Sequence, residues 1–84
     1  MMIEAARKAK IKWQCRRGML ELDLILNRFI DNKLDNLAEP QILSFEKLLL
    51  TPDPELYSWL IDSHFPTDKE MLSIVELVKL HSHI

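Results

Sequence analysis

The sequence predicts an all-α fold, a compact five-helix bundle that forms one domain over residues 1–84. Apolar residues recur every three or four positions, and no stretch shows the alternating pattern of a half-buried strand. Prolines and the single glycine, Gly18, lie between the periodic stretches and separate them into short helices. A domain of this size buries only ~60–65% of the surface that its unfolded chain exposes. We therefore expect one thin core with little room for a deep catalytic pocket.

The first two helices are expected on either side of Gly18. The first runs from Ile3 to Trp13 or Cys15, and Gly18 ends or bends it. The second covers about 19–32 and has an apolar stripe typical of a helix that packs on one face. That stripe consists of Leu22, Ile25, Leu26, Phe29 and Ile30.

The third helix follows a polar turn over 33–36, and Pro40 is suited to its first turn because proline there loses no hydrogen bond. Asp53 is a candidate cap for the fourth helix, with Pro54 at its first position, and Pro66 is expected to stop it. Thr67 and Glu70 have the spacing of a capping box at the start of the fifth helix. The residues expected to face the core from these three helices are Ile42, Phe45, Leu48 and Leu49, then Leu56, Trp59 and Leu60, and last Met71, Ile74, Val75 and Val78.

The charge is distributed unevenly along the chain. Residues 1–17 contain six Lys and Arg against one acid, whereas residues 18–84 contain five against twelve. A basic arm can bind nucleic acid, but the acidic remainder would repel a phosphate backbone, so we expect no nucleic-acid partner and favour a protein. No apolar run approaches the ~18–20 residues of a membrane span. One cysteine and no signal-peptide pattern indicate a cytoplasmic protein.

Few side chains have a spacing that suggests catalysis or metal binding. His81 and His83 alone cannot complete a four-ligand zinc site, and a solvated chain end explains them better. Cys15 is either a redox thiol activated by the two arginines that follow it or a small, half-buried apolar residue. Trp59 is expected in the core, while for Trp13 both packing and a surface role stay open. The sequence therefore predicts no enzyme and no metal.

Gly18 lies in the most informative stretch of the chain. Average composition would give about six glycines in a chain of this length, so a single one suggests a specific requirement at its position. Glycine allows positive φ and close approach of another surface. Arg17 and Glu21 could pair along one face if helical geometry continued through Gly18. Glu21 and Asp23 point about 200° apart on a helix, which argues against an acid–base pair.

The run Trp13-x-Cys15-Arg16-Arg17-Gly18-Met19-x-Glu21-Leu22-Asp23 resembles the Arg-Gly-x-x-Glu motif of the small FAD assembly factors of succinate dehydrogenase. Similarity continues through Phe29, Leu48-Leu49, Asp53-Pro54-x-Leu56 and Trp59-Leu60, so that it covers most of residues 10–80. The family's five-helix bundle agrees with the helix count. Ala38 departs from the family, in which a serine commonly caps the third helix, so that helix must begin with Asn36, Glu39 or Pro40.

The resemblance implies a non-enzymatic accessory protein that binds the flavoprotein subunit of succinate dehydrogenase, or of the related fumarate reductase, and promotes covalent attachment of FAD to it. With no Gly-rich loop and no βαβ unit, the chain is not expected to hold the dinucleotide, which belongs to the client. In this interpretation Gly18 permits close backbone approach, Arg17 makes charge-assisted bonds to the client, and Glu21 orients Arg17 or accepts client donors. Arg16, Asp23 and Trp13 complete the partner-binding surface. The lack of a presequence favours a bacterial member of the family.

Two other classes of function stay open. As a nucleic-acid-binding module, the chain would use its N-terminal Lys and Arg side chains as phosphate contacts. As a general adaptor, for example a partner that neutralises a toxin, it would bind a protein other than a flavoprotein.

Overall fold

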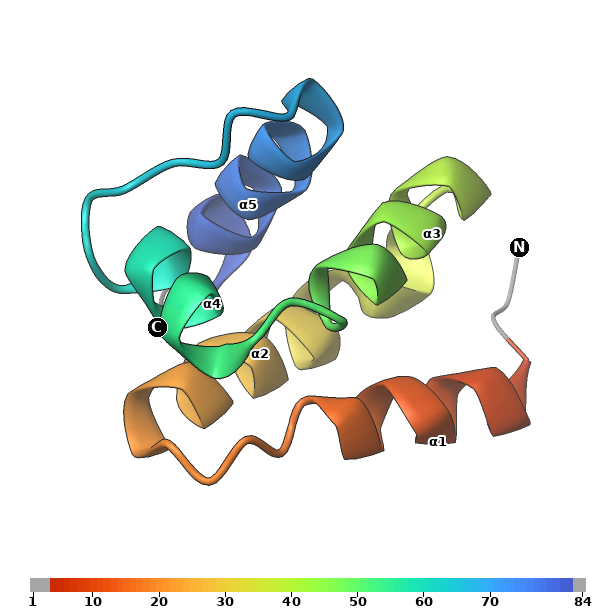
Figure 1. Cartoon of the computed structure of the whole chain (residues 1–84). Helices are drawn as coiled ribbons and strands as arrows, with labels where there is room; N and C mark the ends of the chain where they lie inside the picture. The colour runs from red at the N-terminus through yellow and green to blue at the C-terminus, as the bar shows by residue number, and fades with distance from the viewer. Residues whose placement is uncertain (1–3, 83–84) are drawn as a thin grey trace.

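The computed structural model describes residues 4–82, and in that part of the chain it shows five α-helices and one 3₁₀ turn, with no strand. The predicted all-α class and helix number are confirmed. The helix α1 runs along one edge of the molecule and α5 lies on the opposite side (Figure 1). The elements are α1 (Ala5–Gln14), α2 (Leu20–Lys33), η1 (Leu34–Asn36), α3 (Glu39–Leu48), α4 (Asp53–Leu60) and α5 (Lys69–His81).

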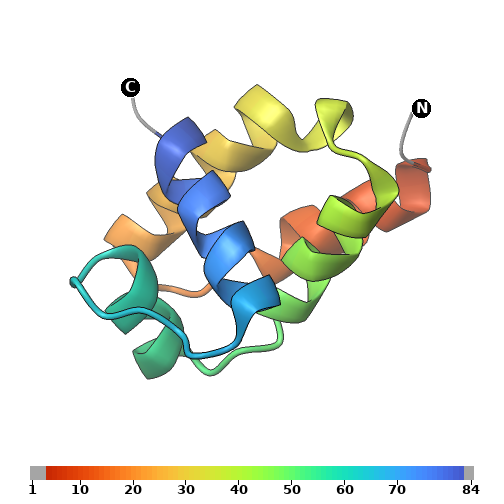
Figure 2. The same ribbon diagram turned by 90° about the horizontal axis from the view of Figure 1, so that it is seen from above.

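The core forms where α5 packs between α2 and α3, an arrangement seen from above in Figure 2. Phe29 and Phe45 meet at its centre, with ring centroids 4.9 Å apart and the rings tilted by 49°. The helices α2 to α5 each contribute the face that their apolar periodicity predicts, except that Ile25, Trp59 and Met71 pack at the margin. The fully or nearly enclosed side chains include Leu22, Leu26, Ile30, Ile42, Leu48, Leu49, Leu56, Leu60, Ile74, Val75 and Val78.

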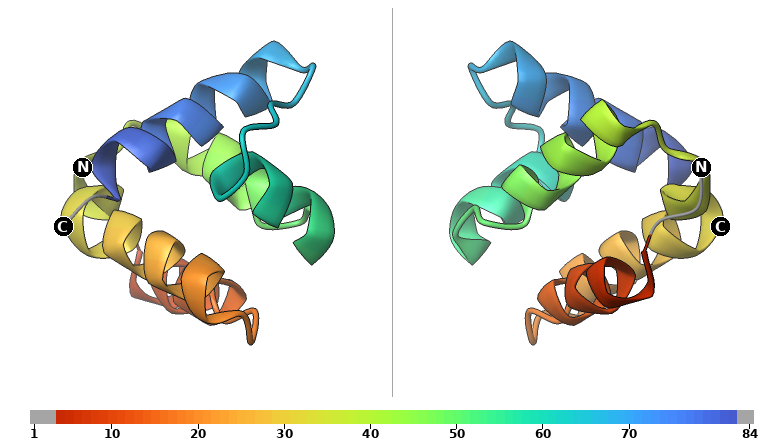
Figure 3. Two further views of the ribbon diagram at one scale, coloured as in Figure 1. Left: turned by 90° about the vertical axis from the view of Figure 1, so that its left-hand side faces the viewer. Right: turned by 90° about the vertical axis from the view of Figure 1, so that its right-hand side faces the viewer.

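α1 lies beside α2 at the lower edge of both views in Figure 3. Ile11 is its one buried residue, and Cys15 directly after the helix is also buried. Ion pairs supply other attachments. Arg7 bonds Glu46 at 2.6 Å and Glu39 at 2.8 Å on α3, and Lys8 bonds Asp35 at 2.9 Å on η1. The predicted start of the first helix at Ile3 lies outside the described residues.

Three predicted helix ends differ from the structure. Asp53 is not a cap but the first residue of α4, with Pro52 before it, and its carboxylate bonds Arg17 instead. Asp68, not Thr67, caps α5, because its Oδ2 accepts the Met71 N–H at 2.9 Å. The helix α4 ends at Leu60, well before the predicted stop, because backbone bonds of residues 61, 62 and 64 close onto its last turn.

The start of α3 shows how the chain manages without a capping serine. The helix begins at Glu39, and Ala38 is the residue before it. The Gln41 side chain reaches back and accepts the Ala38 N–H at 3.0 Å, so that one half of a capping box remains. Pro40 in the first turn loses no hydrogen bond, as expected.

Candidate functional site

The turn between α1 and α2, drawn in orange in Figure 1, is built around Gly18. The backbone tightens after α1, where the Arg16 N–H bonds the Trp13 carbonyl at 3.1 Å, and Gly18 then takes φ +78°. A β-carbon placed on Gly18 would meet no atom within 4 Å. Within the free chain, glycine is therefore required by the backbone conformation and not by crowding. Its position on the surface is open to a partner.

Asp23 fixes this turn from the side of α2. Its Oδ1 accepts the Arg17 N–H at 2.8 Å, and its Oδ2 accepts the Gly18 N–H at 3.3 Å. The carboxylate lies in the first turn of α2, where the helix dipole favours negative charge. Asp23 therefore works inside the turn, holding two consecutive backbone amides.

The Arg17 side chain points inward against the rest of the protein, with only 13% of its surface exposed. Its Nη1 donates to Asp53 at 2.9 Å and to the Thr51 carbonyl, its Nη2 donates to the Leu49 carbonyl, and its Nε donates to Gln14 at 2.8 Å. The pairing of Arg17 with Glu21 that the sequence suggested required a helix through Gly18, and the positive φ of Gly18 breaks that geometry. The acidic partner of Arg17 is thus on α4 and not on α2.

Glu21 lies exposed on the first turn of α2 and faces Tyr57 of α4. The negative charge of Glu21, with burial and the negative charge of Asp62 as further causes, raises the pKa of the Tyr57 hydroxyl. Asp23 accepts backbone N–H groups of the turn, whereas Glu21 lies near Tyr57 of α4. The two side chains thus diverge on the helix, as expected. The two carboxylates do not form a joint acid–base site.

Exposed apolar side chains surround the turn. Trp13 is 71% exposed, which settles its position at the surface, and Arg16 beside the turn is exposed as well. Leu20 and Leu50 are each 75% exposed. Leu50 lies between the two residues whose carbonyls bind Arg17, so the α3–α4 connection belongs to this surface. Exposed aromatic and arginine side chains are typical of protein–protein contacts.

Sequence reasoning missed Asp53, Leu20 and Leu50 as parts of this region. The Asp-Pro pair at 53 and 54 was a visible signal, but it was interpreted as a helix start. Leu20 lies just before the apolar stripe of α2 and outside its buried face, and this mismatch is a signal that could have identified it as an exposed apolar residue. No local signal marked Leu50.

Cys15 is fully buried, and burial raises the pKa of its thiol to about 12, although Arg17 acts in the opposite direction. A thiol with this pKa carries almost no thiolate at neutral pH. The structure therefore contradicts the redox interpretation and supports the apolar one, with Cys15 more deeply buried than the half-burial expected.

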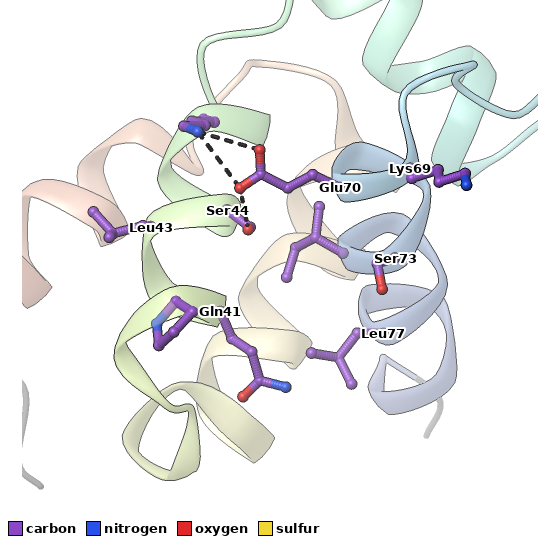
Figure 4. A pocket seen from close by; sticks show the side chains of 10 residues that line it. Gln41, Leu43, Ser44, Lys69, Glu70, Ser73 and Leu77 are labelled. Atoms are coloured by element: carbon purple, nitrogen blue, oxygen red, sulfur yellow. Dashed lines mark hydrogen bonds and ion pairs between the residues drawn. The ribbon is translucent and has the colours of Figure 1, made fainter.

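A groove of about 680 Å³ lies between α3 and α5 (Figure 4). Its Glu70 carboxylate accepts the Ser44 hydroxyl at 2.8 Å and bonds Lys47, and these bonds lower the pKa of Glu70. No histidine or cysteine lines this groove.

No group of three or more potential metal ligands occurs within residues 4–82. His81 ends α5, where its carbonyl accepts the Asn32 side chain at 3.1 Å, and His83 lies outside the described residues. None of the helices in the described part is long and apolar enough to cross a membrane.

Comparison with known proteins agrees with the motif around Gly18. Residues 9–82 match the family model Sdh5, described as the flavinator of succinate dehydrogenase. The chain is 49% identical over 72 residues to the FAD assembly factor SdhE of Legionella pneumophila, covering 86% of this chain and 90% of that protein. It is 41% identical over 78 residues to the SdhE of Coxiella burnetii, covering 93% and 95%. The chain belongs to the family of succinate dehydrogenase flavinators.

Proposed function

We propose that this protein is an assembly factor that binds the flavoprotein subunit of succinate dehydrogenase and promotes covalent attachment of FAD to it. Family membership supports this function, since curated relatives of nearly the same length carry the name FAD assembly factor. The flavoprotein of fumarate reductase, which has related chemistry, is a second client of the same kind. We place the protein in the bacterial cytoplasm, with FAD held by the client and no cofactor of its own.

The docking surface is the exposed region around the turn: Trp13, Arg16, Gly18, Leu20 and Glu21. The observation that carries this assignment is Gly18, which offers bare backbone in open space. Arg17 and Asp23 belong to the same region, where their bonds give the turn its shape. A rigid turn flanked by an exposed tryptophan and arginine provides contact area at small entropic cost.

Attachment of FAD requires the flavin and a client side chain to be held in reacting geometry, and fixed positioning is a strong source of rate acceleration. The assembly factor supplies this by binding one arrangement of the client more tightly than the others. Reciprocity then requires that maturation of the client lower the affinity of the factor for it, so that the finished flavoprotein is released. No step of this scheme needs an acid, base or nucleophile from the factor itself.

The nucleic-acid alternative loses support from the ion pairs. Arg7, Lys8 and Arg17 make up half of the N-terminal basic cluster, and each is paired with a carboxylate of its own chain. Phosphate binding would have to break these pairs or rely on the remaining cations. Binding to a protein partner is therefore the function that the geometry supports best.

The test is co-production of the flavoprotein subunit with wild type, Gly18→Ala or Gly18→Asn, and measurement of flavin fluorescence in the denatured flavoprotein band. Alanine is strained at φ +78°, by about 1–2 kcal/mol, whereas asparagine tolerates that region. If docking needs bare backbone, both variants lose most of the signal although Gly18→Asn folds normally by circular dichroism.

A matched control is Leu80→Ala, which changes an exposed apolar residue on α5 and should leave the fluorescence unchanged. Full signal with Gly18→Asn would reduce the role of Gly18 to conformation alone. Wild type that gives no more covalent flavin than an empty vector would refute the proposed function.

A further inference from the structure

Arg17 joins the end of α1 to a stretch of the chain that lies 32 to 36 residues further along. Its guanidinium donates to the Gln14 carbonyl at the end of α1, to the Leu49 and Thr51 carbonyls after α3, and to the Asp53 carboxylate on α4. We call this set of bonds the Arg17 clasp. Planar arginine suits such a site because its donors form a rigid fork that lysine cannot reproduce.

The clasp and Asp23 hold the Gly18 turn from two sides. The side chain of Arg17 is bound to the α3–α4 connection, while its backbone N–H and that of Gly18 are bound by Asp23 on α2. Arg17 therefore lies between two anchored peptide groups, and Gly18 follows the second of them. Glycine has the greatest backbone freedom of any residue, so an unanchored turn here would sample many conformations.

We propose that Asp53 is a positioning residue for client docking, which it serves by holding Arg17 and thereby the Gly18 turn in the binding-competent shape. This inference rests on the proposed function and deepens it. Asp53 does not touch the client in this scheme, and the Arg17 guanidinium acts inside the protein. Its burial supports this role, since the Arg17 side chain is 13% exposed whereas Trp13 is 71% exposed.

Two roles for Arg17 lead to opposite results when Asp53 changes. If Arg17 positions the turn, Asp53→Asn loosens the clasp and weakens client binding. If Arg17 instead swings out to bind the client, Asp53 competes for it, and Asp53→Asn leaves binding unchanged or strengthens it. The same substitution thus distinguishes an internal role from a direct contact.

The experiment measures the dissociation constant for the purified flavoprotein subunit by calorimetry, with wild type, Asp53→Asn, Arg17→Gln and the double variant. All are assayed at a temperature at which circular dichroism shows the fold intact. We expect each single change to weaken binding by about tenfold and the double variant to be no weaker than Arg17→Gln, because both remove one clasp. Hydrogen exchange at the Gly18 amide should accelerate in both single variants.

Glu70→Gln is the matched control. It removes a carboxylate of similar exposure, 45% against 39%, that links α3 to α5 away from the turn, and it should leave both readouts unchanged. Wild-type binding by Asp53→Asn, or protection of Gly18 equal to wild type, overturns the inference even if Arg17→Gln fails to fold. Failure of the proposed function shows differently, as absence of binding by wild type, while hydrogen exchange still tests the clasp.

Discussion

The interior between α2 and α5 and the α1 edge are held in place by different forces. The interior depends on apolar side chains, with two phenylalanine rings at its centre. The α1 edge has one buried helix residue, Ile11, and is tied down by the ion pairs of Arg7 and Lys8. Apolar burial is strong but non-directional, whereas ion pairs are weaker and fix particular partners. The region proposed for docking therefore lies at the end of α1. The attachment of this helix depends more on specific ion pairs and is weaker than the apolar packing of the interior.

The largest effect is expected from a substitution that disrupts the packing of the interior. Phe29→Ala removes a fully buried ring from the center of the core and should lower the free energy of unfolding by about 3–5 kcal/mol. Urea denaturation followed by circular dichroism measures it. Trp13→Ala, at a position 71% exposed, should change the free energy of unfolding by no more than about 0.5 kcal/mol. Equal losses from the two substitutions would contradict the division into interior and edge.

A smaller effect is expected from loosening the edge. Arg7→Gln removes the bonds from α1 to Glu39 and Glu46. Local opening should then expose Cys15, whose raised pKa and burial otherwise keep it unreactive. We expect faster labelling of Cys15 by a thiol reagent at neutral pH, with little change in the urea midpoint.

Lys47→Gln is the control for this measurement, because it breaks an ion pair between α3 and α5 that does not involve α1. It should leave the labelling rate of Cys15 at the wild-type value. About 1 M salt should accelerate labelling in wild type, since the Debye length falls to about 3 Å and the partly exposed ion pairs of α1 are then partly screened. A labelling rate of Cys15 that changes neither with salt nor with Arg7→Gln would mean that apolar contacts alone hold the α1 edge.

The smallest effect concerns pH. Hydrogen bonds from Arg7 lower the pKa of Glu39 below its ordinary 4.5, and bonds from Ser44 and Lys47 lower that of Glu70. A carboxyl group with a depressed folded-state pKa stabilises the fold above its unfolded pKa, and this stability is lost as pH falls through the folded value. Unfolding measured from about pH 5 to pH 3 should therefore show a shallower loss for Glu39→Gln and Glu70→Gln. An unchanged slope would contradict the pairing; the effect is small because both groups are exposed.

The sequence allowed the helices and their buried faces to be predicted because helical periodicity is local. Phe29, Phe45 and Val75 were placed in the core from spacing alone, and each is fully buried. Helix ends were less predictable, since Thr67 and Asp68 both offer a capping oxygen and only the backbone path selects Asp68.

The candidate site was located from the sequence, but its internal bonds were not. Gly18 and its neighbours stood out by composition and motif, and the positive φ explains the glycine. The partner of Arg17 is 36 positions away, and nothing in local spacing connects them. The pairing arises only when α4 packs beside α2, a tertiary contact that no local pattern encodes.

The Arg17 clasp also has a consequence for the order in which the protein becomes competent during synthesis. Gly18 leaves the ribosome early, but Asp53 emerges 35 residues after it, so a nascent chain that ends before α4 carries the motif without its anchor. If Asp53 positions the turn as proposed, docking competence arises late, when α4 has folded against the first half of the chain. An incomplete chain would present the Arg-Gly sequence to a client and yet fail to hold it.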